Sequence, residues 1–571
     1  MNAERLLQHY EKIADAPDAI AQLRRFILNL AVRGKLVPQD PADEPASELL
    51  KRIAVEKGRL VKADEVKKEK LLEPITAENQ PFVLPIKWSW VRLDPLTRLI
   101  TKGSSPKWQG VNYVNSENGI LFITSENVGN HQLRKLDDLK YVESRFRNIE
   151  PRSMLKRGDI LMNLVGASIG RTAIYDLDLE ANINQAVALI RLVEISDGPF
   201  VRYLLQYFNS PTAIDLMLGS RVITAQPNMS LTDAREFPVP LPPLAEQHRI
   251  VAKVDELMAL CDGLEAARTE RETKRDRLAA ASLARLNTPD PETFPDDARF
   301  SLDALPALTA RPDQIKQLRQ TILNLAVRGK LMPQDPAEEA MKSRKQETPI
   351  NEGELSFDAP TGWSWSEFGD VAKFENGDRG KNYPNRDEYV DKGVAWINTG
   401  HINSDGSLSI TTMNYITRAK FEVLRGGKIR PGDLLYCLRG ATFGKTAFVE
   451  PFKEGAIASS LMIVRPEPIL DRKFTYIYLT SPYGRSQLLR FDNGTAQPNL
   501  SSGSVKKYLI AVPPLAEQHR IVAKVDELMA LCNQLEASLT SADDTRSKLL
   551  DALLAEALAP VSTAGLQEAA E

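Results

Sequence analysis

The most regular hydrophobic pattern in this chain is a heptad repeat near the C-terminus. Steps of four and three residues separate Ile521, Val525, Leu528, Cys532, Leu535, Leu539, Ala542, Arg546, Leu549 and Leu553. This pattern is typical of a long helix that packs along another helix. The same pattern starts at Ile250, but Arg268, Arg271 and Arg275 then occupy the seam. The sequence therefore predicts two long helices, and we expect each to pack antiparallel along the other.

Prolines mark where each long helix starts, because proline is tolerated at the first turn of a helix and not inside it. They stand at 242–243 and 513–514. The first helix is predicted from 244 to about 286, on the order of 60 Å at ~1.5 Å per residue.

The chain is a tandem duplication. Residues 242–261 and 513–532 both read PPLAEQHRIVAKVDELMALC, and ILNLAVRGKL occurs at 27–36 and 322–331. Weaker matches between these blocks are Trp-Ser-Trp at 88–90 and 363–365, GASIGRTA at 166–173 with GATFGKTA at 440–447, and TAQPNMS at 224–230 with TAQPNLS at 495–501. A repeat this long is a whole multi-element unit, which excludes a short-period solenoid.

The ILNLAVRGKL blocks predict shorter helices that end near Gly34 and Gly329, where a C-terminal cap belongs. The globular stretches mix strand-like runs at 119–124, 159–164 and 186–190 with a helix near 199–218. Residues 55–80 and 287–312 are expected to be linkers.

The predicted fold class is α+β, with two globular domains separated by a pair of long antiparallel coiled-coil helices and related by a pseudo-two-fold. The predicted domains are a helical segment with a charged linker (1–80), a globular domain (81–240), a central region with helices at 244–286 and 313–331 (241–355), a second globular domain (356–511) and a C-terminal helix (512–571).

The two copies have diverged unevenly. The helical blocks are identical over long stretches, whereas the globular domains share only short motifs. Identical surfaces are what docking of the same partner twice would require, and diverged domains indicate two different ligands of one chemical kind. The predicted docking residues are Glu246, Gln247, His248, Arg249, Glu517, Gln518, His519 and Arg520.

Composition excludes several classes of protein. With 571 residues, 43% hydrophobic and 26% charged, the chain fits several globular units. It has neither a long apolar run nor a secretory signal, and three cysteines suit a reducing compartment, so we expect a cytoplasmic protein.

Motifs for chemistry are also missing. The five histidines are scattered, and 440–446 is one residue too short for a P-loop, which favours a structural turn there. The sequence predicts a non-catalytic chain with no metal or cofactor of its own.

The globular domains are basic relative to the remainder of the chain. Residues 81–243 carry a net charge of +2 and residues 359–512 carry +5, while the whole chain carries −3. Such local excess suits a polyanion, although a solvated surface gives the same balance. The candidate DNA-binding residues are Ser104, Lys107, Arg171, Gln226, Asn228, Arg379, Lys381, Lys445, Gln497 and Asn499.

The shared TAQPN letters favour phosphate contact or loop architecture over base reading, because two domains that read different sequences would differ there. Base readers are expected where the copies differ, in 103–115 against 377–390 and in 125–135 against 399–410.

Taken together, these motifs resemble the specificity subunit of a type I restriction–modification system (the HsdS family) over nearly the whole chain. The resemblance rests on two domains that each end in Gln-Pro-Asn-(Met/Leu)-Ser, followed by a PPLAEQ helix start. It implies two target-recognition domains that each read half of an asymmetric bipartite site in double-stranded DNA, with the helices setting the gap.

The resemblance also implies partners. Two methyltransferase subunits would dock on the duplicated regions and modify adenine N6 with S-adenosylmethionine, and motor-nuclease subunits would use ATP and magnesium. Two alternatives remain open, namely a specificity subunit of a solitary adenine methyltransferase and a scaffold that binds proteins or glycans.

Overall fold

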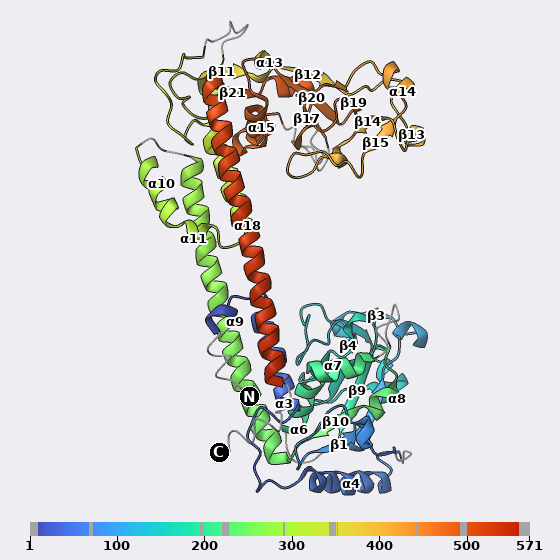
Figure 1. The fold of residues 1–571 in the computed structure, drawn as a ribbon. Coiled ribbons are helices and arrows are strands. Elements are labelled where there is room, and N and C mark those ends of the chain that lie inside the picture. The colour runs from blue at the N-terminus through green and yellow to red at the C-terminus, as the bar shows by residue number, and fades with distance from the viewer. Residues whose placement is uncertain are drawn as a thin grey trace. The chain divides into compact units, whose positions relative to one another are not determined.

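The computed structural model describes residues 10–67, 72–193, 199–219, 228–288, 290, 292–341, 350, 352–439, 444–491 and 500–558. The chain divides into two units (Figure 1). Unit 1 comprises Met1–Thr269 and Asp543–Glu571, and unit 2 comprises Glu270–Ala542. Each unit holds a layer of helices and one domain with two larger sheets and a two-stranded sheet at its base. The predicted α+β fold with two repeated domains is confirmed.

The domain of unit 1 (domain 1) is closed at its base by β1 (Ser89–Arg92), which pairs antiparallel with β10 (Pro238–Leu241). Its main sheet has the order β2-β9-β6-β7, and its second sheet has the order β3-β5-β4-β8. The strands of the main sheet are β2 (Thr97–Lys102), β6 (Ile160–Asn163), β7 (Thr172–Ile174) and β9 (Val187–Leu192). Those of the second sheet are β3 (Tyr113–Val114), β4 (Gly119–Ile123), β5 (Lys140–Glu143) and β8 (Ala181–Ile183).

The main sheet is buried on both faces, which explains its nearly continuous apolar runs. Ile160 and Ile190 pack with residues of α6 (Pro199–Phe208) and α7 (Pro211–Leu218). Alternate residues such as Leu161 and Leu189 pack instead against the second sheet. The predicted strands are therefore present, and the single helix predicted near 199–218 is divided into α6 and α7, because Ser210 caps a new helix that starts at Pro211.

The domain of unit 2 (domain 2) repeats this topology. β11 (Ser364–Glu367) pairs with β21 (Leu509–Val512), and the sheets have the orders β12-β20-β17-β18 and β13-β15-β14-β19-β16. The strands are β12 (Ala372–Asn376), β13 (Tyr389–Val390), β14 (Val394–Ile397), β15 (Asn414–Ile416), β16 (Lys428–Ile429), β17 (Leu434–Cys437), β18 (Thr446–Phe448), β19 (Gly455–Ile457) and β20 (Leu461–Pro466). The helices are α13 (Phe368–Val371), α14 (Arg418–Val423), α15 (Arg472–Thr480), α16 (Pro482–Leu489) and α17 (Ser502–Lys506).

A buried ion pair is repeated inside the two domains. Arg191 donates to the Asp159 carboxylate at 2.6 Å, and Arg465 donates to Asp433 at 2.7 Å. Each aspartate follows a glycine directly before β6 or β17, at Gly158-Asp159 and Gly432-Asp433, so the same ion pair has a structural role in both copies.

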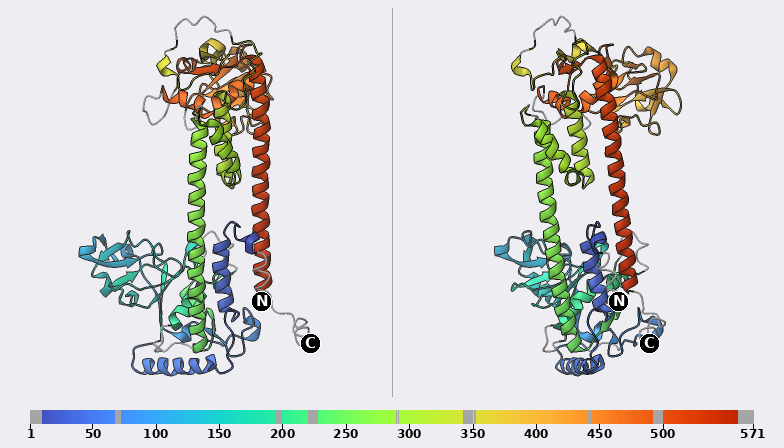
Figure 2. Two further views of the ribbon diagram at one scale, coloured as in Figure 1. Left: turned by 90° about the vertical axis from the view of Figure 1, so that its left-hand side faces the viewer. Right: turned by 60° about the vertical axis from the view of Figure 1, so that its left-hand side comes forward.

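The long helices are α9 (Leu244–Asn287) and α18 (Leu515–Leu558), each of 44 residues. Each contributes its first part to the unit of its own domain and its last part to the other unit. In unit 1 they enclose α3 (Ala19–Val32), as Figure 2 shows. In unit 2 the corresponding helix is α12 (Pro312–Val327).

The apolar seam of each long helix packs on the shorter helix of its unit, where we had expected its duplicate. In unit 1, Ile250 and Val254 of α9 pack with Ile27 of α3. Phe26, on another face of α3, packs with Leu553 at the end of α18. The reason is that the short helix carries apolar residues on two faces, so it needs a long helix on each.

Unit 2 repeats this arrangement with α12. Ile322 of α12 packs with Ile521 and Val525 of α18. On the other side, Asn324 donates to the carbonyl oxygen of Asn287, the last residue of α9, at 2.9 Å.

Two segments that we expected to be linkers contain helices. Residues 46–62 form α4 (Ala46–Lys62), whose Leu49 and Ile53 are buried in the core of unit 1. The segment 287–312 contains α10 (Phe294–Asp303) and α11 (Leu305–Leu308). The remaining short helices are α2 (Tyr10–Ile13), α5 (Phe146–Ile149) and α8 (Leu231–Glu236). Among the residues described, no helix is both long and apolar enough to span a membrane.

Candidate nucleic-acid interface

The loops of domain 1 that differ most from domain 2 meet at one edge of its two sheets. Gly103 follows β2 and donates its N–H to the carbonyl oxygen of Asn184 at 3.2 Å. Asn184 in turn donates to Ile123, the last residue of β4, at 3.0 Å. Leu164, after β6, donates to Ala186 at 2.9 Å. The loops that follow β2, β4, β6 and β8 therefore share one edge, which we call the loop edge.

Domain 2 builds its loop edge with the same backbone bonds. Ala458 donates its N–H to Ile397, the last residue of β14, at 2.8 Å. Leu438, after β17, donates to Ser460 at 2.9 Å. The two domains therefore present different side chains on one shared backbone frame.

A glycine is required where the first loop leaves the sheet. A Cβ atom on Gly103 would overlap the carbonyl oxygen of Ile183. A Cβ atom on Gly377 would lie 2.6 Å from the carbonyl oxygen of Ile457, which is closer than real Cβ contacts. The glycine of each loop thus allows the close approach of two backbone segments.

The candidate residues of domain 1 that are described all lie at its loop edge. Lys107 is exposed on the short 3-10 helix Pro106–Gln109, and Ser104 accepts a hydrogen bond from Gln109 at 3.0 Å. Arg171 directly precedes β7, and exposed Asn228 forms a bridge with Val165 in the loop after β6. Gln226 lies outside the described residues.

Domain 2 presents Arg379 and Lys381 as exposed cations in the loop after β12. Lys445 precedes β18, and its ammonium group donates to the carbonyl oxygen of Ile402 at 3.4 Å. Gln497 and Asn499 lie outside the described residues.

The sequence did not indicate a further exposed cation, Arg425, which lies 3.6 Å from the buried carboxylate of Asp378 in the loop that carries Arg379 and Lys381. Asp378 accepts from the backbone N–H groups of Gly380 at 2.7 Å and Arg425 at 2.9 Å. These two bonds hold the pKa of Asp378 below its usual value. Arg425 is 47 residues away in sequence, so no local motif predicted that it belongs to this loop.

The two weak motifs of the loop edge have architectural roles. Gly170 and Gly444 adopt positive φ and close the turns that follow β6 and β17, as expected for structural turns. Residues 440–443 lie outside the described residues. Ser230 and Ser501, the last letters of the TAQPN(M/L)S segments, cap α8 and α17.

Polar residues at the start of the identical α9 block bond to other parts of unit 1, which changes their interpretation. The indole N–H of Trp88 donates to Glu246 at 2.9 Å, and Gln39 donates to the same carboxylate at 2.6 Å. Burial raises the pKa of Glu246. Arg249 pairs with Asp43 at 2.5 Å.

The same contacts recur in unit 2. Trp363 donates to Glu517 at 3.0 Å, Gln334 donates to it at 3.4 Å, and Arg520 pairs with Glu338. We call each set of contacts a Trp–Glu clamp, which comprises Gln39, Asp43, Trp88, Glu246 and Arg249 in unit 1 and Gln334, Glu338, Trp363, Glu517 and Arg520 in unit 2.

Half of the predicted docking residues are therefore buried within the chain, where docking would require them to be exposed. Glu246, Gln247, Glu517 and Gln518 are at most 2% exposed, because they bond within the chain. Arg249 and Arg520 are partly buried in the clamps, and only His248 and His519 are exposed.

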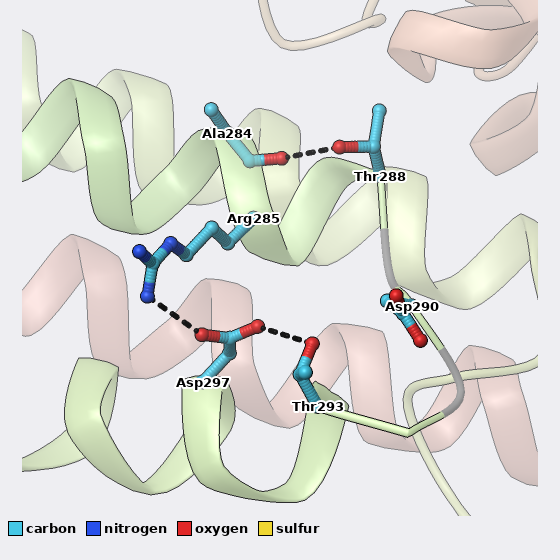
Figure 3. A pocket seen from close by; sticks show the side chains of 6 residues that line it. All are labelled: Ala284, Arg285, Thr288, Asp290, Thr293 and Asp297. Carbon is cyan, nitrogen blue, oxygen red and sulfur yellow. Dashed lines mark hydrogen bonds and ion pairs between the residues drawn. The ribbon is translucent and has the colours of Figure 1, made fainter.

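A cleft of about 420 Å³ in unit 2 lies between the end of α9 and the start of α10 (Figure 3). Within it Asp297 pairs with Arg285 at 3.1 Å and accepts from Thr293 at 3.0 Å. Within the described ranges, no three His, Cys, Asp or Glu side chains gather to hold a metal ion.

Comparison with known proteins adds the family. The sequence model of the type I restriction modification DNA specificity domain matches residues 123–272 and 360–542. The chain is 31% identical to the type I restriction enzyme EcoAI specificity subunit of Escherichia coli, over 94% of this chain and 93% of that protein. It is 29% identical to the EcoEI specificity subunit of the same species, over 94% of each. A chain from a solved type I R-M system is 20% identical, with a TM-score of 0.48, over 84% of this chain and 99% of that one.

Proposed function

We propose that this chain, which belongs to the type I restriction–modification DNA specificity family, is the non-catalytic subunit that binds DNA and assembles a methyltransferase. Each domain would read one half of an asymmetric bipartite site in double-stranded DNA. The carrying observation is the loop edge, which is built twice from the same backbone bonds and carries different exposed side chains.

The chemistry of the loop edge supports a nucleic-acid ligand. Domain 1 exposes Lys107 beside Trp108, which is 75% exposed. Domain 2 exposes Arg379, Lys381 and Arg425. Cations contact phosphates, and planar aromatic or guanidinium groups stack on bases, so both sets suit DNA.

The proposed docking surface for the partners consists of leucine side chains that are exposed on the long helices, where packing within the chain does not explain them. Leu260 of α9 and Leu531 of α18 lie in the identical twenty-residue block, yet they are 59% and 48% exposed. Leu264 and Leu535, one turn later, are 40% and 38% exposed. An apolar pair repeated on two helices suits two copies of one helical partner, for which we propose the methyltransferase subunits.

Other parts of the proposed assembly act through partners. Motor-nuclease subunits would join the complex, and S-adenosylmethionine, ATP and magnesium would be bound by those subunits. The number of residues in α9 and α18 would set the gap between the half-sites.

The test is the methylome of a host that carries this chain with its methyltransferase. We expect one bipartite adenine-methylated motif. Replacing residues 81–240 by the corresponding domain of a related subunit should change one half of that motif. A change in both halves, or the absence of a bipartite motif, would contradict the proposal.

A further inference from the structure

The loop after β4 and its counterpart after β14 fold into hairpins with one frame. Hairpin 1 spans residues 127–134 and hairpin 2 spans residues 401–409. In hairpin 1, Asn127 donates its N–H to Thr124 and its carbonyl oxygen accepts from Arg134, both at 2.9 Å. A bridge between Val128 and Leu133 closes the loop.

Hairpin 2 repeats each of these contacts. His401 donates its N–H to Asn398 at 3.1 Å, and its carbonyl oxygen accepts from Ser409 at 2.8 Å. The closing bridge joins Ile402 and Leu408.

The hairpins differ at their tips. Asn130 and Gln132 are exposed in hairpin 1. The exposed tip residues of hairpin 2 are Asn403, Ser404, Asp405 and Ser407. A shared frame with different polar tips is the arrangement expected of two readers of different sequences.

The side chain of the first residue of each hairpin accepts an equivalent backbone hydrogen bond, through a different chemical group in each hairpin. The amide oxygen of Asn127, which is 3% exposed, accepts the N–H of Thr124 at 3.0 Å. Nδ1 of His401, which is 4% exposed, accepts the N–H of Asn398 at 3.1 Å. An imidazole nitrogen accepts a hydrogen bond only when the ring is neutral, whereas an amide oxygen accepts at any pH.

We propose that Asn127 and His401 are the positioning residues of two base-reading hairpins, and that hairpin 2 holds its frame only while His401 is neutral. This inference rests on the proposed DNA-reading function. Burial lowers the pKa of His401, which keeps the ring neutral at pH 7. Protonation would turn the Nδ1 acceptor into a donor that faces another N–H group.

Other titratable groups lie around hairpin 2. Lys445 donates to Ile402, and Tyr476 of α15 donates to the carbonyl oxygen of Asp405 at 3.2 Å. The pKa of Asp405 is lowered by its bonds from Ser407, and the pKa of Tyr476 is raised by burial. Cys437 of β17 is buried nearby in the same core.

The experiment selects bound duplexes from a randomised 40-bp pool with the full chain at pH 7.5 and pH 5.5, followed by sequencing. At pH 5.5 we expect enrichment of one half of the motif to fall about tenfold, the factor that corresponds to losing one net hydrogen bond of about 1.4 kcal/mol. In His401→Asn, which copies the amide of Asn127, that half should keep its enrichment. His401→Gln serves as a second amide variant, and thermal unfolding at both pH values checks folding.

The reciprocal variant is Asn127→His, which should make the other half lose enrichment at pH 5.5 beyond the wild-type change. Hairpin 1 contains a histidine of its own, His131, whose pKa is lowered by burial. Any pH response caused by His131 would affect the half of the motif read by domain 1, and it would persist in H401N. A motif whose halves respond alike in wild type and H401N would overturn this inference alone. Recovery of no bipartite motif at pH 7.5 would overturn the proposed function and this inference with it.

Discussion

At the scale of single residues, the Trp–Glu clamp explains why distant blocks of sequence are shared between the copies. Trp88 and Glu246 are 158 residues apart, and neither neighbourhood indicates the other. Glu246 lies in the identical repeated block, which is why the sequence predicted a docking residue. Glu246 is buried because the fold brings the indole of Trp88 and the amide of Gln39 to its carboxylate, and no local sequence pattern indicates those two contacts.

Removing one donor should destabilise unit 1 in a pH-dependent way. Trp88→Phe leaves the Glu246 carboxylate short of a hydrogen bond, for which we expect a loss of about 1–3 kcal/mol in the free energy of unfolding at pH 7. Because burial already raises the pKa of Glu246, wild-type stability falls as pH rises through and above the usual glutamate value. The loss in the variant should therefore shrink toward pH 4.5, where the carboxyl group is more than half protonated.

Chemical unfolding at pH 4.5 and pH 7 measures this difference. Trp90→Phe is the matched control, because its indole donates to the carbonyl oxygen of Phe82 at 3.2 Å and no carboxylate is involved. Equal and pH-independent losses in the two variants would contradict the clamp.

A second residue-scale prediction concerns the glycine of the first loop. Gly103→Ala should destabilise domain 1 by about 1–3 kcal/mol, because the new methyl group overlaps the Ile183 carbonyl oxygen. Gly58→Ala on α4 meets no atom within 4 Å and should be neutral or stabilising by up to about 1 kcal/mol. Thermal unfolding compares the two, and an unaffected G103A would show that the loop can move away from β8.

At the scale of elements, periodicity predicted the helices and strands better than it predicted their partners. The twenty identical letters and the proline pairs placed the start of α9 at Leu244, where the structure has it. The heptad predicted which face of α18 is buried but not that α12 packs on it, because an apolar stripe indicates burial without identifying the element that buries it. Leu535, on the predicted seam, is 38% exposed, which marks where packing on α12 departs from a continuous heptad.

The exposed leucines of the long helices provide the element-scale prediction. Leu260→Asp and Leu531→Asp should each remove one methyltransferase subunit from the complex, because a charge in an apolar contact is costly to bury. Mass measurement of the purified assembly gives the number of subunits. Val55→Asp on α4, at a residue 75% exposed, should leave assembly intact, and loss of a subunit in that control would refute the assignment.

At the scale of the whole molecule, each long helix contributes its first part to one unit and its last part to the other. Lengthening only one helix would shift its last part out of register with α3 or α12. Lengthening both by the same amount preserves the packing at each end.

A paired insertion tests whether the helices set the gap. Seven residues added to α9 near Thr269 and to α18 near Ala542 extend each helix by about 10.5 Å and nearly keep its phase. At about 3.4 Å per base pair, the gap in the methylated motif should grow by roughly 3 base pairs with both half-sites unchanged. Methylome sequencing reads the motif, and an unchanged gap in an active complex would contradict the proposal.

The pairing of β1 with β10, and of β11 with β21, gives each domain a narrow neck where the chain enters and leaves side by side. A segment bounded in this way can be inherited as a cassette. The identical blocks of residues on either side keep the flanking structure the same in both copies, and the neck ensures that an incoming domain meets the same two strand ends. Under the proposed function, exchange of one domain would give a new combination of half-sites while the contacts of the helical scaffold stay unchanged.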